Sequence, residues 1–232
     1  MSYQIVNEGK ARLFVYALER YKVSSNEYVP SKAAVFYNPL MRTNRDMMIS
    51  VLKTAAQIDN RKFSMGEPMA GVGVRSMRAL LETEAVGFAY VNDLNEEAYA
   101  LMQKNTAMNG LSNRTQVTNL NATAFLANHS HGFDKFDYVD LDPFGSPAPH
   151  LEQTVSSLGH EGLMGVTATD TAVLFGAHPK KTRLRYGSFV ERVPFMKEVG
   201  IRVLIGSTVL TAARHQLGIV PLLCYSERHY LR

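Results

Sequence analysis

The chain contains only one cysteine, Cys224, among 232 residues. A single thiol excludes an internal disulfide and any zinc site built from several cysteines within this segment. We expect Cys224 to be a buried core residue. The seven histidines are scattered along the chain, without a cluster of acids or cysteines beside them. No metal site is therefore predicted.

Long apolar runs are also lacking. No uninterrupted stretch approaches the ~20 residues that a membrane-spanning helix needs, and the opening MSYQIVNEGK does not resemble a signal peptide. We therefore expect a soluble, cytoplasmic protein without a membrane partner. A hydrophobic content of 46% and this chain length are typical of one large globular domain.

A large excess of charge is lacking as well, because the formal net charge is only +4. That value permits a polyanionic partner without requiring one. The densest basic stretch is HPKKTRLR, residues 178–185. We interpret it as a surface loop that is either simply solvated or in contact with nucleic-acid phosphates. Its candidate RNA-binding residues are Lys180, Lys181, Arg183 and Arg185.

What the sequence does contain is a regular alternation of strand-like and helix-like segments. Strands are predicted at residues 62–67, 85–92, 115–119, 136–141 and 162–167. Helices are predicted at residues 74–82, 96–109, 122–128, 151–158 and 199–216. This alternation indicates an α/β fold with a doubly wound, mostly parallel sheet.

Both ends of the chain add further elements. Amphipathic helices are predicted at residues 8–21 and at residues 45–58, the second capped by Asn44. Residues 219–225 are expected to form a strand, and residues 228–232 to begin its hairpin partner.

The residues that leave each strand are the candidate site, because ligands of open α/β sheets bind beyond the carboxyl ends of the strands. The first exit, GEPMAGVG, contains Glu67, Gly71 and Gly73, and glycines allow backbone to approach a ligand closely. A structural packing turn is the alternative, since the full G-x-G-x-x-G pattern is absent. The second exit ends in Asp93. Its carboxylate suits the two ribose hydroxyls of an adenosine moiety, although a helix N-cap is the other interpretation.

The fourth exit reads DLDPFGSP, residues 140–147. Asp142 supplies a carboxylate, Pro143 fixes a turn, and Phe144 supplies a ring that can lie against a base. These parts suit an amino group on an aromatic heterocycle, because the carboxylate and a backbone carbonyl can hold its two hydrogens. A structural turn explains the prolines but not the acid and the aromatic together.

These motifs resemble the Trm1 family of tRNA (guanine-26-N2)-dimethyltransferases. The resemblance rests on four segments in order, FYNP at 36–39, NRD at 44–46, DLDPFGSP at 140–147 and GVTATD at 165–170. It implies a Rossmann-like class I methyltransferase that uses S-adenosylmethionine to modify the exocyclic N2 of guanine 26 in tRNA, first to the monomethyl and then to the dimethyl product.

The resemblance also implies a domain organisation. Residues 61–232 are expected to form the methyltransferase domain, with residues 1–60 as an N-terminal extension packed on it. The family also has a separate C-terminal tRNA-binding domain, which we expect to be absent from this chain. The end at Arg232 favours a truncated protein over a naturally short homologue.

Carried over position by position, the resemblance assigns roles to individual residues. The catalytic group is Asp142, Pro143 and Phe144. Asn121 and Ala122, at the third exit, border the adenine, although Asn121 stands where an acid is expected. The cofactor-binding set is Arg45, Glu67, Gly71, Gly73, Arg75, Asp93, Asn121 and Ala122.

Two of these assignments have structural alternatives. Arg45 alternatively pairs with Glu8 or Asp46, and Arg75 is alternatively a solvated helix residue.

Other functions remain open at this point. Asp-Pro-aromatic loops also serve methyl transfer to adenine N6 or cytosine N4. A dinucleotide-dependent oxidoreductase would share the glycine turn and Asp93 but would have no use for the DPFG loop. A non-catalytic RNA-binding module would bind no cofactor. The oligomeric state is open, with a monomer favoured.

Overall fold

The computed structural model describes residues 3–17, 22–24, 27–28, 32–132 and 134–232. A five-stranded parallel sheet in the order β7-β6-β5-β8-β9 forms its centre. The chain moves outward from β5 to β7 and then returns to β8 beside β5, so the strand order reverses between β5 and β8. The strands are β5 (Phe63–Glu67), β6 (Val86–Asn92), β7 (Thr115–Thr118), β8 (Phe136–Leu141) and β9 (Leu158–Val166). The predicted doubly wound α/β sheet is confirmed.

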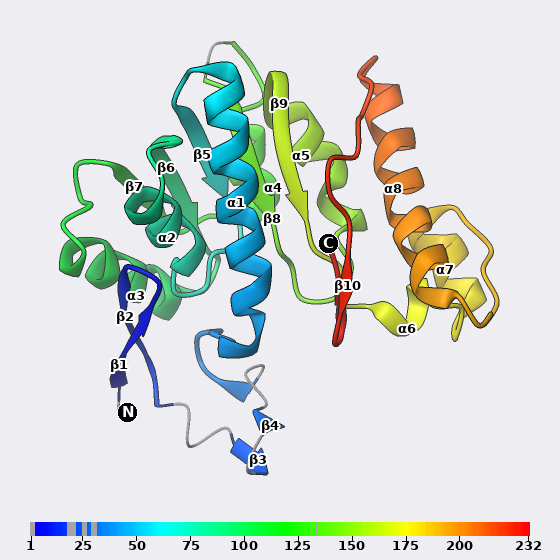
Figure 1. The fold of residues 1–232 in the computed structure, drawn as a ribbon, viewed down its shortest axis with the longest axis horizontal. Helices are drawn as coiled ribbons and strands as arrows, with labels where there is room; N and C mark the ends of the chain where they lie inside the picture. The colour runs from blue at the N-terminus through cyan, green and yellow to red at the C-terminus, as the bar shows by residue number, and fades with distance from the viewer. Residues whose placement is uncertain (1–2, 18–21, 25–26, 29–31, 133) are drawn as a thin grey trace.

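Helices cover both faces of this sheet (Figure 1). One face carries α1 (Arg42–Asp59), α2 (Val74–Glu82) and α3 (Glu96–Met108). The other carries α4 (Ala122–Ala127), α5 (Leu151–Ser157) and α8 (Met196–Arg214). Shorter helices complete the fold, namely η3 (Pro39–Met41), η4 (Ala148–His150), α6 (Thr171–Leu174) and α7 (Pro179–Tyr186).

The core lies where the strands are covered on both sides. Met65, Val91 and Leu141, in three neighbouring strands, have no exposed surface. Such burial explains why these strands read as nearly continuous apolar runs. A second, smaller core joins α6, α7 and α8 and contains Leu174 and Tyr186.

The N-terminal segment is a β-hairpin, so the helix predicted at residues 8–21 is wrong; its residues 18–21 lie outside the described residues. β1 (Tyr3–Glu8) pairs antiparallel with β2 (Ala11–Tyr16). Ala11, Leu13 and Val15 are fully buried, which is the two-residue period of a strand. Their packing against α2 and α3 decides between the two periods that the sequence allows.

Two local predictions in the rest of the chain are also corrected. Helix α1 begins at Arg42, so Asn44 lies inside it and is not its cap. The basic stretch 178–185 forms helix α7 rather than a loop. Pro179 lies in the first turn of α7, and Gly187, with φ +68°, follows its last residue. Proline at the start and glycine just after the end are common at helix boundaries.

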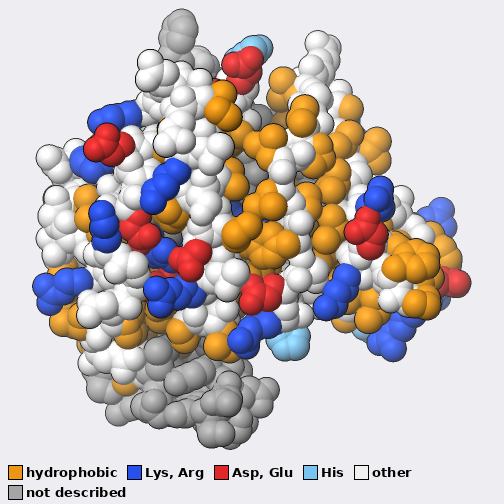
Figure 2. Space-filling model, viewed as in Figure 1, with side chains coloured by type: hydrophobic (Ala, Val, Ile, Leu, Met, Phe, Trp, Pro, Cys, Tyr) orange, Lys and Arg blue, Asp and Glu red, His pale blue; other side chains and the backbone are white. Residues whose placement is uncertain are grey.

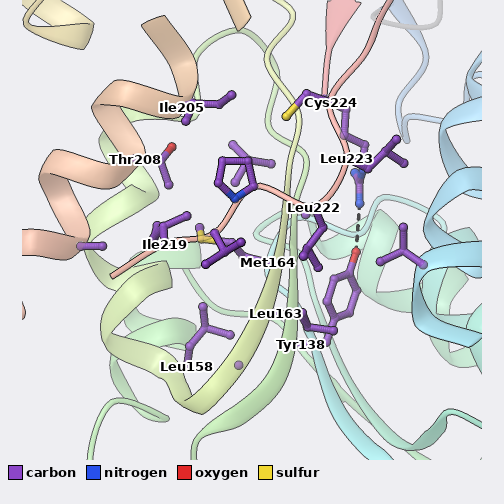
Figure 3. Close-up of a pocket in the computed structure, with 18 of the residues that line it drawn as sticks. Tyr138, Leu158, Leu163, Met164, Ile205, Thr208, Ile219, Leu222, Leu223 and Cys224 are labelled. Atoms are coloured by element: carbon purple, nitrogen blue, oxygen red, sulfur yellow. Dashed lines mark hydrogen bonds between the residues drawn. The ribbon is translucent and has the colours of Figure 1, made fainter. Parts of the chain in front are cut away.

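The C-terminal segment differs from prediction too. Residues 219–225 form no strand; the hairpin is short, β10 (Ser226–Glu227) with β11 (Tyr230–Leu231). Cys224 is exposed rather than part of the core, and its segment runs between β9 and α8 (Figure 1). A mostly apolar cavity of about 280 Å³ lies between this segment, β9 and α8 (Figure 3).

The N-terminal region also contains the short hairpin β3 (Lys22–Ser24) and β4 (Glu27–Tyr28). Within the described part of the chain, no helix has the length and apolar character to cross a membrane.

Candidate active site

A cavity of about 350 Å³ opens at the carboxyl ends of β5, β6 and β8. This is the edge at which doubly wound sheets bind ligands. Segments that precede α1 form its other wall, through Phe36 and Tyr37. The predicted site residues that line it are Arg45, Glu67, Gly71, Arg75, Asp93, Asp142, Pro143 and Phe144.

Three predicted cofactor residues do not line this cavity. Gly73 is the N-cap of α2, with φ +77°. Asn121 caps α4, because its Oδ1 accepts a hydrogen bond from the Thr123 N–H at 2.9 Å. Ala122, the first residue of that helix, is buried.

The glycine turn is fastened to the second strand exit. The Gly71 N–H donates to Asp93 Oδ2 at 2.8 Å. Gly71 has φ +56°, and a Cβ there would stand 2.7 Å from the Phe36 carbonyl oxygen, so a larger residue does not fit. Asp93 Oδ1 accepts from the Asn95 N–H at 3.0 Å, and Asn95 rather than Asp93 is the N-cap of α3. Each Asp93 oxygen thus has one protein partner and one further acceptor position.

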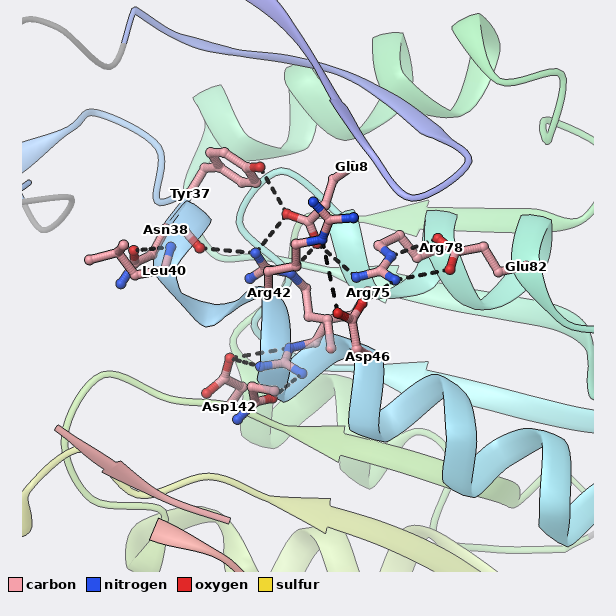
Figure 4. A network of polar contacts seen from close by, with 12 residues as sticks. Glu8, Tyr37, Asn38, Leu40, Arg42, Asp46, Arg75, Arg78, Glu82 and Asp142 are labelled. Atoms are coloured by element: carbon pink, nitrogen blue, oxygen red, sulfur yellow. Dashed lines mark hydrogen bonds and ion pairs between the residues drawn. The ribbon is translucent and has the colours of Figure 1, made fainter. Parts of the chain in front are cut away.

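The loop carboxylate is paired with a buried arginine. Arg75 Nε and Nη2 both donate to Asp142 Oδ2, the first at 3.2 Å (Figure 4). Arg75 Nη1 donates to Asn44 Oδ1 at 2.7 Å. The Arg75 side chain is only 3% exposed, so its interpretation as a solvated helix residue is wrong. Asp142 Oδ1 takes no part in this contact.

Arg45 has a buried carboxylate partner, Glu8. Arg45 Nε donates to Glu8 Oε1 at 2.6 Å and Nη2 donates to Oε2 at 2.7 Å. Tyr37 and Arg78 also donate to Glu8. Burial alone would raise the pKa of Glu8, but these donors hold it below its ordinary value. The pairing of Arg45 with Glu8 is therefore confirmed.

Glu67 lies beneath the glycine turn. It is 2% exposed and accepts a hydrogen bond from the Ser76 N–H at 3.1 Å. Burial raises the pKa of Glu67 to about 8. Its neutral form is therefore favoured near neutral pH.

Phe144 stands at the mouth of the cavity, with 68% of its surface exposed. Its ring meets the ring of Phe36 edge to face, with centroids 4.6 Å apart and planes at 78°. Two aromatic rings at one cavity wall offer an apolar surface for a flat heterocycle. The sequence marked Phe36 only as part of a motif, because nothing local indicates its contact with Phe144.

A second buried carboxylate was missed as a site component. Asp140 is 1% exposed, and Arg232 Nη2 donates to its Oδ2 at 2.6 Å. Arg75 Nε lies 3.5 Å from Asp140 Oδ1. Burial would raise the pKa of Asp140, but Arg232 and Arg75 lower it to about 2. The chain Arg232–Asp140–Arg75 therefore connects the C-terminal hairpin to Asp142.

The predicted RNA-binding residues lie outside the cavity, on α7. Lys180, Lys181 and Arg183 are exposed, whereas Arg185 Nη1 donates to Asp170 Oδ2 at 2.9 Å.

A parallel sheet in this order, with a cavity at its strand-order reversal, defines a Rossmann-like class I methyltransferase fold. The chain belongs to the N2,N2-dimethylguanosine tRNA methyltransferase family, whose family model matches residues 16–232.

Two curated relatives illustrate the similarity in sequence. The tRNA (guanine(26)-N(2))-dimethyltransferase of Pyrobaculum calidifontis is 40% identical over 230 residues, which cover 99% of this chain and 61% of that protein. The tRNA (guanine(26)-N(2)/guanine(27)-N(2))-dimethyltransferase of Aquifex aeolicus is 37% identical, with 99% of this chain and 56% of that protein covered.

A solved structure is similar over nearly the same span. The complex of Trm1 from Pyrococcus horikoshii with S-adenosyl-L-methionine superposes with a TM-score of 0.84 at 32% identity, covering 98% of this chain and 59% of that chain. The chain thus spans between 56% and 61% of the length of these three proteins.

Proposed function

We propose that this chain transfers methyl groups from S-adenosylmethionine to the exocyclic N2 of guanine 26 in tRNA, yielding first the monomethylated and then the dimethylated base. The supporting observation is that Asp142, Pro143 and Phe144 share one cavity with the turn at Gly71 and with Asp93. The names of the relatives support the choice of guanine over adenine or cytosine. A cytoplasmic location belongs to the same proposal, because its substrate is tRNA.

The polar groups around the cavity fit this cofactor. Asp93 has an acceptor position on each oxygen for the two ribose hydroxyls, and Gly71 lines the same cavity beside it. When bound, the cofactor supplies an electrophilic methyl group on a sulfonium. Arg45 and Arg75 remain proposed contacts, through N–H groups beyond those already paired. Contacts from Glu67, Gly73, Asn121 and Ala122 remain predictions.

The loop residues prepare the amine. The lone pair of the guanine amino nitrogen is delocalised into the ring, so the nitrogen is a weak nucleophile. Asp142 Oδ1 and the Pro143 carbonyl hold its hydrogens, favour a more pyramidal nitrogen and stabilise the positive charge that develops on it. Arg75 fixes the carboxylate through Oδ2 and leaves Oδ1 for the amine. The proton lost afterwards passes to Asp142 or to water.

The aromatic residues hold the base. Phe144 and Phe36 bind the ring of a guanine that has left the helical stack, which places the amine beside Asp142. The second transfer requires the monomethylated amine to bind again with its one remaining hydrogen.

The test is incubation of the chain with an unmodified tRNA transcript and labelled S-adenosylmethionine, followed by nucleoside analysis. We expect N2-methylguanosine and N2,N2-dimethylguanosine at position 26. A transcript with adenosine at that position is the control and should gain no label. Label in N6-methyladenosine or N4-methylcytidine would show that the base assignment is wrong.

A further inference from the structure

Helix α7 is attached to the loop that carries Asp142. Ser146 Oγ, in that loop, donates to the Tyr186 hydroxyl at 2.8 Å. The Tyr186 hydroxyl in turn donates to Asp170 Oδ1 at 2.7 Å. Tyr186 belongs to the last turn of α7 and is 2% exposed. The position of α7 relative to the loop is therefore set by buried groups rather than by a surface contact.

The same loop is joined to the cavity wall. The Gly145 N–H donates to Thr169 Oγ1 at 2.7 Å, and the Thr169 N–H donates back to the Gly145 carbonyl at 2.9 Å. Thr169 and Phe144 both line the cavity. A continuous set of hydrogen bonds thus leads from the proposed base site to α7.

The face of α7 that points away from these bonds is basic. Thr182, one turn before Tyr186, is buried, whereas Lys180, Lys181 and Arg183 are exposed. Arg185 differs from them, because its ion pair with Asp170 fastens the helix to the loop network. Three of the four basic residues therefore face outward and one anchors the helix.

Positive charge is concentrated in this part of the molecule. Residues 178–202 contain seven Lys or Arg against two Glu, a net charge of +5, whereas the whole chain has +4. Figure 2 shows Lys and Arg side chains, with fewer acidic ones, around apolar side chains on the lobe built from α6, α7 and α8. Leu184 and Phe189, two apolar residues of this segment, are 85% and 67% exposed. Basic residues interleaved with exposed apolar and aromatic groups favour an RNA backbone over a protein partner.

We propose that Lys180, Lys181 and Arg183 on the outer face of α7 bind the RNA phosphates next to the nucleotide whose base enters the cavity. This inference rests on the proposed function, because it takes the cavity to be the base site. Phosphate contacts fix the register of a nucleic acid without reading its sequence. The α7 face therefore positions the substrate strand, while Phe144 and Asp142 act on the base.

The experiment compares two double variants of the chain that remove the same amount of positive charge. K180Q/K181Q alters α7, and K62Q/K135Q alters two lysines that precede β5 and β8, at the opposite edge of the sheet. The affinity for an unmodified tRNA transcript is measured by fluorescence anisotropy over a series of salt concentrations, without cofactor. We expect K180Q/K181Q to bind about tenfold more weakly, with a salt slope smaller by about two, and K62Q/K135Q to bind like the unsubstituted chain.

Equal RNA affinity of the two variants would overturn the proposal. So would a K180Q/K181Q chain with unchanged RNA affinity and an altered oligomeric state, because α7 would then be a protein contact. Methyl transfer by the unsubstituted chain is measured separately at saturating RNA. Binding that depends on α7 without any transfer would contradict the proposed reaction, whereas transfer without dependence on α7 would contradict this inference alone.

Discussion

Arg75 holds Asp142 through a single oxygen, with Nε and Nη2 both directed at Oδ2. Because Arg75 is buried and also contacts Asn44, it cannot turn away to follow a substrate. The carboxylate is therefore positioned before the base arrives, and its Oδ1 is the atom proposed to receive the amine. Such preorganisation is the condition under which a charge contributes most to a transition state.

Replacement of Asp142 by Asn should slow the chemical step by ~10²-fold or more, because the charge that stabilises the developing ammonium is lost. Cofactor affinity should change little. Single-turnover methylation with saturating cofactor and tRNA measures the step directly. Asp137→Asn is the matched control, since Asp137 lies at the other end of the same strand and pairs with Arg61. A wild-type rate for Asp142→Asn would transfer the role to another acid, with Asp140 the first candidate.

Asp93→Ala should weaken S-adenosylmethionine binding by roughly 2 kcal/mol or more, because hydrogen bonds to a charged group are lost. The turn at Gly71 also loses its acceptor. Titration calorimetry measures the affinity, and circular dichroism checks that the variant is folded. An unchanged affinity in a folded variant would remove Asp93 from the cofactor site.

Phe144→Ala should impair capture of the base, since stacking on an aromatic ring contributes ~1–3 kcal/mol per base. The KM for tRNA should rise by about tenfold while cofactor affinity stays the same. Phe36→Ala should act in the same direction, because the two rings form one wall. Phe144→Tyr preserves the ring and should retain much of the activity. If Phe144→Ala had the KM of the unsubstituted chain, the ring would not contact the base.

Glu67→Gln should change how stability depends on pH. The pKa of Glu67 is about 8 in the folded chain against an ordinary 4.5, so the folded state binds this proton more firmly than the unfolded state. Its contribution to stability is present below about pH 4.5 and is lost as the pH rises toward 8. Urea unfolding from pH 4.5 to 8 should therefore show a smaller decline for Glu67→Gln. The exposed Glu84→Gln serves as the control, and a decline in Glu67→Gln equal to that of the control would contradict the assignment.

The arrangement of the sheet was predictable from local patterns. Helix α2 and strand β8 have the predicted bounds to the residue. Each of these elements is long enough for its period to be unambiguous, and alternation of strands with helices leaves few other topologies.

The N-terminal hairpin shows where local patterns fail. Leu13 fits a helix with Phe14 and equally fits a strand with Ala11 and Val15. Contact with α3 favours the strand, because Asn105 Oδ1 in that helix accepts a hydrogen bond from the Phe14 N–H at 2.7 Å and holds the strand in place. No residue near Phe14 in the sequence signals that contact.

The sequence by itself determined which chemical groups follow the strands. These groups are the glycine turn, Asp93 and the DPF loop. They could be located because strand ends and turn residues are marked by their own neighbours in the chain. Only the tertiary structure decided which charges and rings meet. Glu8 with Arg45, Phe36 with Phe144 and Arg232 with Asp140 join distant segments. Such pairs follow no local period; the packing of the hairpin, helices and sheet brings them together.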